Sequence, residues 1–480
     1  MKGLPQGPVS WVIDRLGLGP VVEKVRTHKV PPQLHGKRGW YYVFGAATLT
    51  ALLVQLATGI GLATVYVPSA AQAHETLGVI TATPFGGLVR ALHYWGASAM
   101  VVLMLLHAAR VYLTGSYKFP REGTWMVGTV LFLLVMTLAL TGQLLRWDEN
   151  GLYTVVVASK FIARVPLIGQ PLGEFLLAGS DVGGATLSRF FALHVIVLPL
   201  LLLAGVGHHL WLVLHHGISE PPESGRPVDK RTYRAWYHDQ KERLGIHYVP
   251  DSAWREAIVA VGVVSIIFAL ALVFGPKGPG PAPDPARFVA HPAPDWFVRW
   301  WYALLYLKPR SLESFVMIWG PLLFLGSMFA LPLLAPTGER TMTRRPWAPV
   351  VVGVFAVSCV SLTWLGLRSP WTPPPDLPPI SAARLGVAEG SAEAAGAKAF
   401  VHRGCAQCHQ VLGEGGRWGP DLTALALRVS REEATVRIVM GLGDMPAYGG
   451  LLDKEELDAL VAFLWRLPDV RGGDTGGASR

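Results

Sequence analysis

Long runs of residues without a formal charge recur along this chain. Seven long stretches contain no Asp, Glu, Lys or Arg, namely residues 40–68, 91–109, 125–145, 190–219, 257–276, 314–338 and 347–367. An α-helix of about 20 apolar residues is enough to cross the hydrocarbon core of a bilayer. The pattern therefore predicts an all-α protein whose main part is a bundle of seven transmembrane helices.

The composition and the placement of charge agree with a membrane protein. Apolar residues make up 51% of the 480 residues, whereas Asp, Glu, Lys and Arg together make up only 16%. The net charge is +9, but the basic residues gather before the first span and after spans two, four and six, so no nucleic-acid partner is expected. Because these segments share one side of the membrane, the positive-inside rule predicts a cytoplasmic N-terminus. Seven spans then place the C-terminus outside.

The segments between the spans define the expected domains. These are a cytoplasmic lead-in (1–40), a four-span bundle (41–216), a cytoplasmic loop (217–253), a three-span region (254–368), a Pro/Ala-rich linker (369–391), a small extracytoplasmic all-α domain (392–468) and a glycine-rich tail (469–480). The proline-rich linker should be semi-rigid. The small domain should contain helices at 392–402 and 453–467, and the tail should be disordered.

Four of the spans carry a pair of unusual residues at nearly the same spacing. The pairs are His93 with His107, His194 with His209, Gly45 with Gly59, and Gly128 with Gly142. A histidine inside a membrane span is costly and usually functional, and glycine lets a flat macrocycle approach a helix because it has no Cβ. Fourteen or fifteen residues of helix separate the two levels by roughly 21 Å. The pattern predicts two non-covalent b-type haems, each bound by one histidine from each of two helices.

One of these ligands cannot be chosen from its position in the sequence. His208 and His209 are adjacent in the fourth span. A helix turns by about 100° per residue, so only one of the two can face the haem that its partner histidine requires. Both residues remain candidates at this level of reasoning.

A third haem site is expected near the C-terminus. The sequence Cys405-Ala406-Gln407-Cys408-His409 has the form of a c-type haem attachment motif. Cys405 and Cys408 would form thioethers with the haem vinyl groups, and His409 would bind the iron. Met445 is the expected second axial ligand, with Met440 as a nearby alternative. Methionine and histidine ligation together raise the reduction potential of a haem.

Several segments resemble cytochrome b of the quinol–cytochrome c oxidoreductases, and most of all the short b-type subunit of chloroplast and cyanobacterial bf complexes. The similar segments are LVQLATG at 53–59, LVRALHYWGAS at 88–98, RVYLTG at 110–115 and GISEPP at 217–222. The resemblance extends over 40–221 to a four-span subunit, over about 240–368 to a three-span subunit, and over 392–468 to cytochrome c.

The resemblance implies roles for the membrane residues. Counting back from Gly-Ile-Ser in the family selects His209 as the ligand. His93 and His194 would then bind the outer haem, and His107 and His209 the haem nearer the cytoplasm. Arg90 and Arg110 stand where they could neutralise haem propionates.

The resemblance also points to two quinone sites. Pro294-Asp295-Trp296-Phe297 is similar to the Pro-Glu-Trp-Tyr element of the quinol oxidation site. A carboxylate in an apolar pocket can accept a proton as quinol is oxidised, which makes Asp295 the implied catalytic residue. Aspartate is shorter than glutamate, so a bridging water or a shifted quinol is expected. His215 and His216 lie near a family position that contacts quinone at an inner reduction site, although the register differs by at least one residue.

The resemblance as a whole implies a fused cytochrome b–cytochrome c subunit of a proton-translocating quinol–cytochrome c oxidoreductase in a bacterial cell membrane. Quinol would give one electron to a Rieske iron–sulfur protein and on to haem c, and the other through both b haems to quinone. The implied partners are that separate Rieske protein, membrane quinol and quinone, a cytochrome c or terminal oxidase as acceptor, and a second copy of the chain. A non-catalytic membrane electron carrier and an enzyme that runs in reverse are the alternatives.

A further covalent haem at the inner quinone site is not expected. Chloroplast-type bf complexes and several related ones attach such a haem through one cysteine near the start of the first span. Aligning Gly45 and Gly59 with that family places Val43 at the cysteine position. Valine cannot form a thioether, and Cys359, expected to be a buried packing residue, lies in the seventh span. We therefore expect two b haems and one c haem.

Overall fold

The computed structural model divides the chain into two compact units. It describes residues 7–34, 36–179, 182–283, 294–308, 312–368, 377–416, 419–441, 445 and 447–474. Unit 1 comprises Met1–Trp147, Val155–Pro279 and Trp300–Leu362, and unit 2 comprises Asp148–Thr154, Gly280–Arg299 and Thr363–Arg480. Unit 1 holds the membrane helices, and unit 2 holds the small C-terminal domain.

Seven helices in the described part of the chain are long and apolar enough to cross a membrane. They are α3 (Phe44–Ala63), α5 (Pro84–Leu113), α6 (Glu122–Leu144), the continuous Gly184–His216 that joins α9, η3 and α10, α12 (Ala253–Phe274), α14 (Glu313–Leu334) and α15 (Trp347–Arg368). Each overlaps one of the charge-free runs, so the all-α class and the seven spans are confirmed. Large apolar side chains such as Ile60, Leu133 and Leu201 remain exposed on these helices, as expected of surfaces that face lipid.

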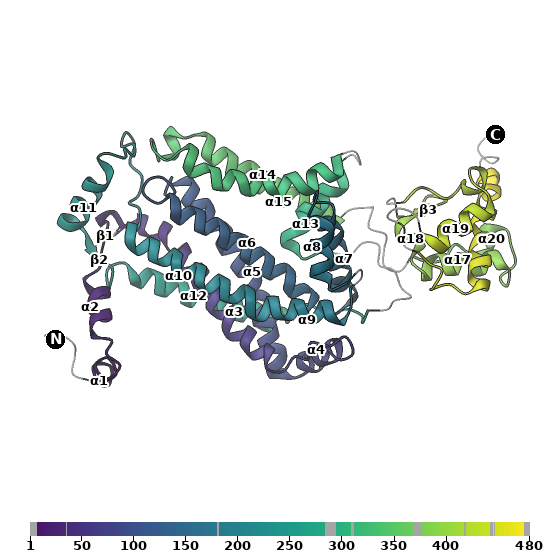
Figure 1. Cartoon of the computed structure of the whole chain (residues 1–480), viewed down its shortest axis with the longest axis horizontal. Coiled ribbons are helices and arrows are strands. Elements are labelled where there is room, and N and C mark those ends of the chain that lie inside the picture. The colour runs from purple at the N-terminus through teal and green to yellow at the C-terminus, as the bar shows by residue number, and fades with distance from the viewer. Residues whose placement is uncertain are drawn as a thin grey trace. The chain divides into compact units, whose positions relative to one another are not determined.

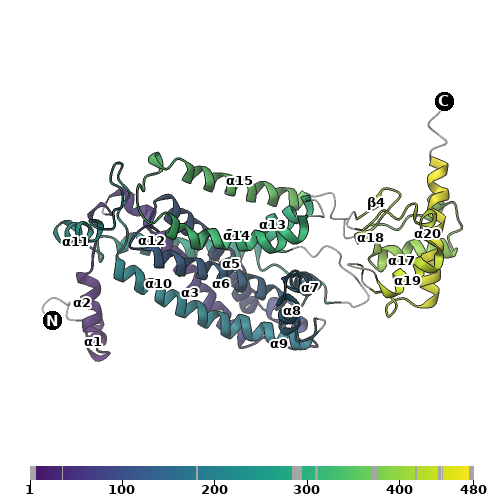
Figure 2. The same cartoon turned by 45° about the horizontal axis from the view of Figure 1, so that its top comes forward.

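Two helix pairs form the centre of unit 1. Helix α3 packs along α5, and α6 packs along α10 (Leu198–His216), so that the four helices run side by side (Figures 1 and 2). Small residues allow α3 and α5 to approach closely. A Cβ on Gly96 would lie 2.2 Å from Nε2 of Gln55, and this amide donates a hydrogen bond of 3.0 Å to the carbonyl oxygen of His93.

Shorter elements surround the spans. They are α1 (Pro8–Arg15), α2 (Gly19–Thr27), η1 (Pro32–Leu34), η2 (Lys37–Tyr42), α4 (Ala73–Ala82), α7 (Glu149–Ala163), α8 (Gly169–Leu177), α9 (Gly184–Ala192), η3 (Leu193–Val197), α11 (Tyr233–Leu244), α13 (Trp296–Leu307) and η5 (Met342–Arg344). Strand β1 (Lys29–Val30) pairs antiparallel with β2 (Ile246–His247), with Lys29 opposite His247. The lead-in and the loop after the fourth span therefore meet at the same end of unit 1.

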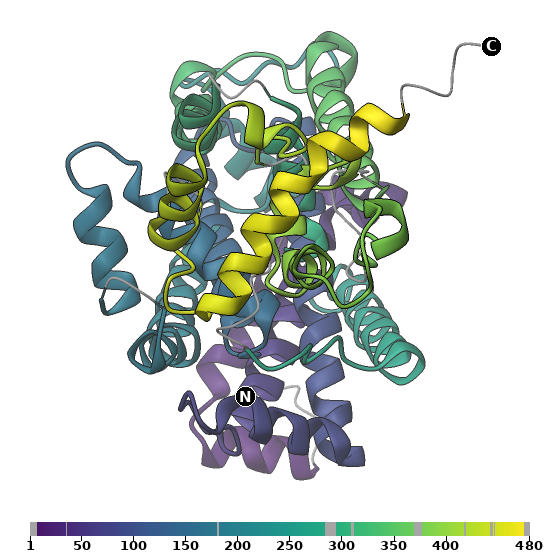
Figure 3. The same cartoon turned by 90° about the vertical axis from the view of Figure 1, so that its right-hand side faces the viewer.

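The small domain of unit 2 is built around two crossing helices. Its elements are α16 (Ala382–Leu385), α17 (Ala392–His402), α18 (Cys405–Cys408), β3 (Gln410–Val411), β4 (Glu414–Gly415), η6 (Leu425–Leu427), α19 (Arg431–Met440) and α20 (Lys454–Asp474). Figure 3 shows α20, in yellow, crossing this domain. A Cβ on Gly396 of α17 would lie 2.0 Å from the carbonyl oxygen of Ala459, so only glycine allows the helices to cross here. Phe400 and Phe463 pack beside this point, with ring centroids 5.5 Å apart.

Two expected boundaries of the small domain differ from the structure. Ile380 and Leu385, assigned to the linker, are buried in the same core as Phe400. The domain therefore begins before residue 392. Helix α20 continues to Asp474, into the segment expected to be a tail, because Val470 packs against this core.

Candidate haem-binding sites

The structure brings the four predicted histidines together in two pairs. His93 of α5 faces His194 of η3 with ring centroids 6.3 Å apart, and His107 of α5 faces His209 of α10 at 6.5 Å. We call these the first and the second histidine pair. A bond from a metal to an imidazole nitrogen is about 2 Å long and that nitrogen lies about 1 Å from the ring centre, so two rings on one metal have centroids roughly 6 Å apart. Both pairs fit one iron.

Each of the four predicted glycines lies against one of these histidine rings. A Cβ built on each glycine would come close to Cε1 of one histidine ring. The distance would be 3.4 Å from Gly45 to His107 and 3.2 Å from Gly59 to His93. It would be 3.5 Å from Gly128 to His209 and 2.8 Å from Gly142 to His194. Sequence reasoning assigned the glycines to the approach of the macrocycle. In the structure their missing side chains make room for the ligands, so α3 orients the histidines of α5, and α6 orients those of η3 and α10.

A π-helical segment explains the unequal spacing of the two histidine helices. His93 and His107 are 14 residues apart within one α-helix, whereas His194 and His209 are 15 apart. His194 lies in the π-helical segment η3, where a wider turn takes up one additional residue. The extra residue therefore does not rotate His209 away from the bundle. His208 is exposed and stacks on Trp211 at 5.6 Å, so the structure favours His209 as the ligand.

Two threonines hold the first pair in one tautomer. Thr58 Oγ1 lies 2.9 Å from Nδ1 of His93 and donates its own proton to the carbonyl oxygen of Val54 at 2.7 Å. Its oxygen therefore accepts a proton from Nδ1, which leaves Nε2 of His93 free to bind iron. Thr141 makes the same contact with His194 at 3.1 Å. Sequence reasoning missed both threonines, although each stands directly before a glycine of the repeated pattern.

The two arginines predicted to neutralise propionates have partners within the protein. Arg90 is buried and donates hydrogen bonds to the carbonyl oxygens of Lys277 and Gly278, in the non-helical segment that follows α12. Arg110 donates to the carbonyl oxygen of Tyr41 at 2.8 Å, and its guanidinium lies 4.0 Å from the ring centroid of Tyr42. These contacts attach η2 and the segment after α12 to α5, and a role toward propionates stays a prediction.

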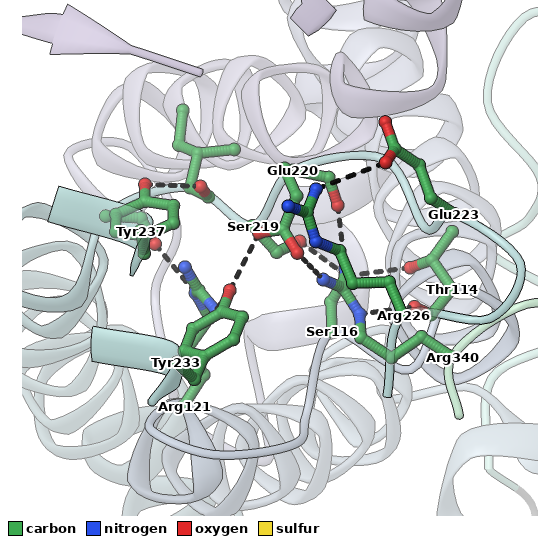
Figure 4. A network of polar contacts seen from close by, with 12 residues as sticks. Thr114, Ser116, Arg121, Ser219, Glu220, Glu223, Arg226, Tyr233, Tyr237 and Arg340 are labelled. Carbon is green, nitrogen blue, oxygen red and sulfur yellow. Dashed lines mark hydrogen bonds and ion pairs between the residues drawn. The ribbon is translucent and has the colours of Figure 1, made fainter. Parts of the chain in front are cut away.

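A buried polar network lies at the end of the bundle beyond the second pair (Figure 4). Arg121 donates to the hydroxyl of Tyr233 at 2.8 Å, and this hydroxyl donates to Glu220 at 2.7 Å. Glu220 also forms an ion pair with Arg340, with side chains 8% and 3% exposed. Burial raises the pKa of Tyr233 to about 12, although the nearby Arg121 acts in the opposite direction. The network joins the loops after α5 and α10 to the loop before α15.

The histidines assigned to an inner quinone site do not converge. His215 is exposed and stacks on Trp211 with centroids 5.3 Å apart. His216 ends α10, and its carbonyl oxygen accepts a hydrogen bond of 3.4 Å from Arg121. A cavity of about 250 Å³ lies beside the polar network, with Glu220 and Trp236 in its wall, but neither histidine lines it.

Asp295 stands immediately before helix α13. Its carbonyl oxygen accepts a hydrogen bond of 3.1 Å from the backbone of Val298, and Arg299 donates to the carbonyl oxygen of Pro294 at 3.2 Å. Asp295 is half-buried and belongs to unit 2. Residues 284–293, which precede this element, lie outside the described part of the chain, so the catalytic role of Asp295 stays a prediction.

The residues of the CAQCH motif lie together on one helical turn and the residue that follows it. Cys405 and Cys408 lie on the single turn of α18, and His409 follows in extended conformation. Nδ1 of His409 lies 2.9 Å from the carbonyl oxygen of Pro420, to which it donates, so Nε2 is left for iron. A Cβ on Gly419 would lie 2.5 Å from the ring of His409, so glycine is required beside this ligand.

The described residues favour Met445 over Met440 as the second axial ligand. Met445 is partly buried and packs against the core of the small domain. Met440 ends α19 and is 72% exposed. Asp444 and Pro446, on either side of Met445, lie outside the described part of the chain.

Comparison with known proteins relates three successive regions of the chain to known families. Three family models match: cytochrome b/b6/petB at residues 29–217, cytochrome b (C-terminal)/b6/petD at 282–378, and cytochrome c oxidase, cbb3-type, subunit III at 391–464. The chain is 38% identical to cytochrome b6 of Synechococcus elongatus over 213 residues, which are 44% of this chain and 97% of the relative. Cytochrome b6 of another Synechococcus species has the same identity over the same shares of the two chains. A solved structure described as a hyperthermophilic respiratory Complex III is similar over 78% of this chain and 92% of its own, with a TM-score of 0.62 and 27% identity.

Proposed function

Because the chain belongs to the cytochrome b/b6 family and carries a cytochrome c domain, we propose that it is the fused cytochrome b–cytochrome c subunit of a proton-translocating quinol–cytochrome c oxidoreductase. It is a multi-pass membrane protein with b-type and c-type haems. The observation that carries the proposal is the geometry of the two histidine pairs, at 6.3 and 6.5 Å, within one four-helix bundle. Such a bundle can conduct electrons between the two sides of a membrane.

The geometry of the two histidine pairs supports an assignment of the b-haem ligands. His93 and His194 would hold one b haem, and His107 and His209 the other. His409 and Met445 would hold the c haem attached to Cys405 and Cys408. Each bound haem supplies one-electron oxidation and reduction. Val43, at the position of the family's extra thioether, supports the absence of a further covalent haem.

The placement of basic segments supports an orientation for these sites. With the N-terminus in the cytoplasm, the first pair holds the outer haem and the second pair the inner haem. The strand pair β1–β2, which brings two basic segments to one end of unit 1, is consistent with this orientation. The C-terminal cytochrome c domain then lies outside the cell membrane, where an extracytoplasmic cytochrome c or a terminal oxidase can accept its electrons.

Quinol oxidation would take place on the outer side. Asp295 would accept a proton from the quinol hydroxyl, as a carboxylate can when it is held close to the reacting group. One electron would leave through a separate Rieske protein to haem c. The other would cross the bundle to a quinone bound at the inner face, near His215 and His216. The complex would be a dimer of this chain with its Rieske partner.

A direct test uses the full chain purified from membranes together with its Rieske protein. Addition of a short-chain quinol should reduce the b haems and haem c, which are followed by their separate absorption bands. Reduction of haem c should require the Rieske protein. Equal reduction of haem c without it would favour the non-catalytic carrier, and failure of quinol to reduce any haem would overturn the proposed function.

A further inference from the structure

The two histidine pairs differ in what their Nδ1 atoms contact. In the first pair, Nδ1 of His93 and of His194 each lies within hydrogen-bond distance of a threonine hydroxyl. In the second pair, Nδ1 of His107 has no hydrogen-bond partner among the described residues. Nδ1 of His209 faces the carbonyl of Thr124, just as His194 faces the carbonyl of Leu138, but unlike His194 it has no hydrogen-bond partner among the described residues. Only in the first pair, therefore, does a threonine hydroxyl lie beside Nδ1 of each histidine and accept its proton.

The difference is encoded in the residue before each glycine. The glycine lies against Cε1 of its histidine, which brings the preceding side chain beside Nδ1 of the same ring. That preceding residue is Thr58 or Thr141 at the first pair, and Phe44 or Val127 at the second. Two Thr-Gly dipeptides thus mark one of two otherwise matching sites.

The direction of these hydrogen bonds is set by the helix backbone. Thr58 donates to the carbonyl of Val54 at 2.7 Å, and Thr141 donates to the carbonyl of Thr137 at 2.9 Å. Each hydroxyl has given its only proton, so its oxygen accepts from the imidazole. Both threonines are buried, at 9% and 6% exposure, so water does not replace them readily. An imidazole that donates in this way is a more basic ligand for its metal.

We propose that Thr58 and Thr141 lower the reduction potential of the haem at the first pair relative to the haem at the second. A more basic ligand stabilises ferric over ferrous iron, and hydrogen bonding to axial ligands is one means by which proteins set haem potentials. The inference rests on the proposed binding of b haems by these histidines. The resulting difference favours electron flow from the first pair to the second, the direction in which an electron would cross the membrane.

Redox titration of the two b haems in the purified full chain tests this inference. Thr58→Val and Thr141→Val should each raise the midpoint of the first-pair haem and leave the second unchanged. The shift should be upward, because hydrogen bonding to an axial ligand is one of the means that set a haem potential. A tenfold change in the preference for oxidised iron would appear as a shift of about 59 mV for one electron. Thr58→Ser keeps the hydroxyl and should restore the original midpoint.

Matched controls lie on the same two helices. Thr48 of α3 and Thr137 of α6 also donate to the carbonyl four residues earlier, each at 2.8 Å. Their change to valine should shift neither haem. The reverse change, Val127→Thr, places a hydroxyl beside His209 in the same register and should lower the midpoint of the second-pair haem.

The outcomes separate this inference from the proposed function. The inference would be overturned if the first-pair haem had the same midpoint in Thr58→Val, Thr58→Ser and the unaltered chain. It would also be overturned if the valine variants shifted the midpoints of both haems equally. If the Thr58→Val variant loses the first-pair haem, the Val127→Thr variant provides the test. A lower midpoint of its second-pair haem would support the inference, and an unchanged midpoint would overturn it. Pyridine haemochrome analysis of the unaltered chain counts the b haems. Fewer than two would refute the proposed haem sites, whereas two with unaltered midpoints would refute only the role of the threonines.

Discussion

Gly142 lies against His194 more tightly than any of the other three glycines lies against its histidine. A Cβ on Gly142 would be 2.8 Å from the ring Cε1, whereas the same atom on Gly128 would be 3.5 Å from His209, an ordinary contact distance. The ring of His194 therefore leaves no room for a side chain at Gly142, whereas the ring of His209 leaves room for a methyl group at Gly128.

We expect Gly142→Ala to displace His194 and to remove or perturb the first-pair haem, because a methyl group cannot occupy that space. Gly128→Ala is the matched control on the same helix and should retain the second-pair haem. Dithionite-reduced spectra and haem content of the two purified variants check this. Equal loss in both variants would show that contact with the macrocycle, rather than with the histidine, requires the glycines.

The assignment of the ligands can be tested with adjacent residues. His209→Leu should abolish the second-pair haem, as should replacement of His107, whereas replacement of His93 or His194 should abolish the first. His208→Leu should retain both haems, because His208 stacks on Trp211 outside the bundle. Redox-resolved optical spectra distinguish the two haems. If His208→Leu lost the second-pair haem and His209→Leu retained it, the assignment of His209 would be wrong.

The proposed proton acceptor can be tested without disturbing the haems. Asp295→Asn should retain all three haems and reduce quinol oxidation at least about tenfold, because the amide cannot accept the proton. Quinol-dependent reduction of haem c measures the activity, and dithionite-reduced spectra measure the haems. Normal turnover in this variant would favour the non-catalytic carrier.

The buried ion pair between Glu220 and Arg340 should matter for stability. Glu220→Gln leaves Arg340 buried without its counter-charge, and such a change costs about 3–5 kcal/mol. Glu223 and Arg226 form an exposed pair nearby, at 3.2 Å and with side chains 42% and 44% exposed (Figure 4). Glu223→Gln should therefore cost at most about 1 kcal/mol.

Thermal loss of the b-haem absorbance in detergent compares the two glutamate variants. The transition should fall to a clearly lower temperature in Glu220→Gln than in Glu223→Gln. Similar transitions in both would mean that Glu220 and Arg340 contribute no more than a surface pair.

The haem content follows from the positions of the cysteines. Extraction with acidified acetone and pyridine haemochrome analysis should give a ratio of removable b haem to covalent c haem near two to one. The double variant Cys405→Ser, Cys408→Ser should lose all haem stain on a denaturing gel. Covalent haem that persists in this variant would contradict the expectation of a single thioether-bound haem and would point to Cys359, the remaining cysteine.

The sequence by itself determined the features that depend on local composition. A span needs a run of apolar residues without charge, so all seven helices were predictable from composition alone. Helix α17 begins and ends at the predicted Ala392 and His402. The histidine and glycine pairs were recognisable because a helix repeats its geometry along the chain, so that equal spacing marks equal depth.

Tertiary structure decided the features that depend on contacts between distant segments. The resemblance implied His209 rather than His208, but the physical reason, a π-helical segment around His194 and the exposure of His208, appears only in the structure. Thr58 meets His93 only because α3 packs along α5, and Glu220 meets Arg340 across 120 residues of chain. The early start of the small domain, at Ile380, likewise depends on packing against its core. The identity of a residue limits which bonds it can form, but the folded chain selects its partner.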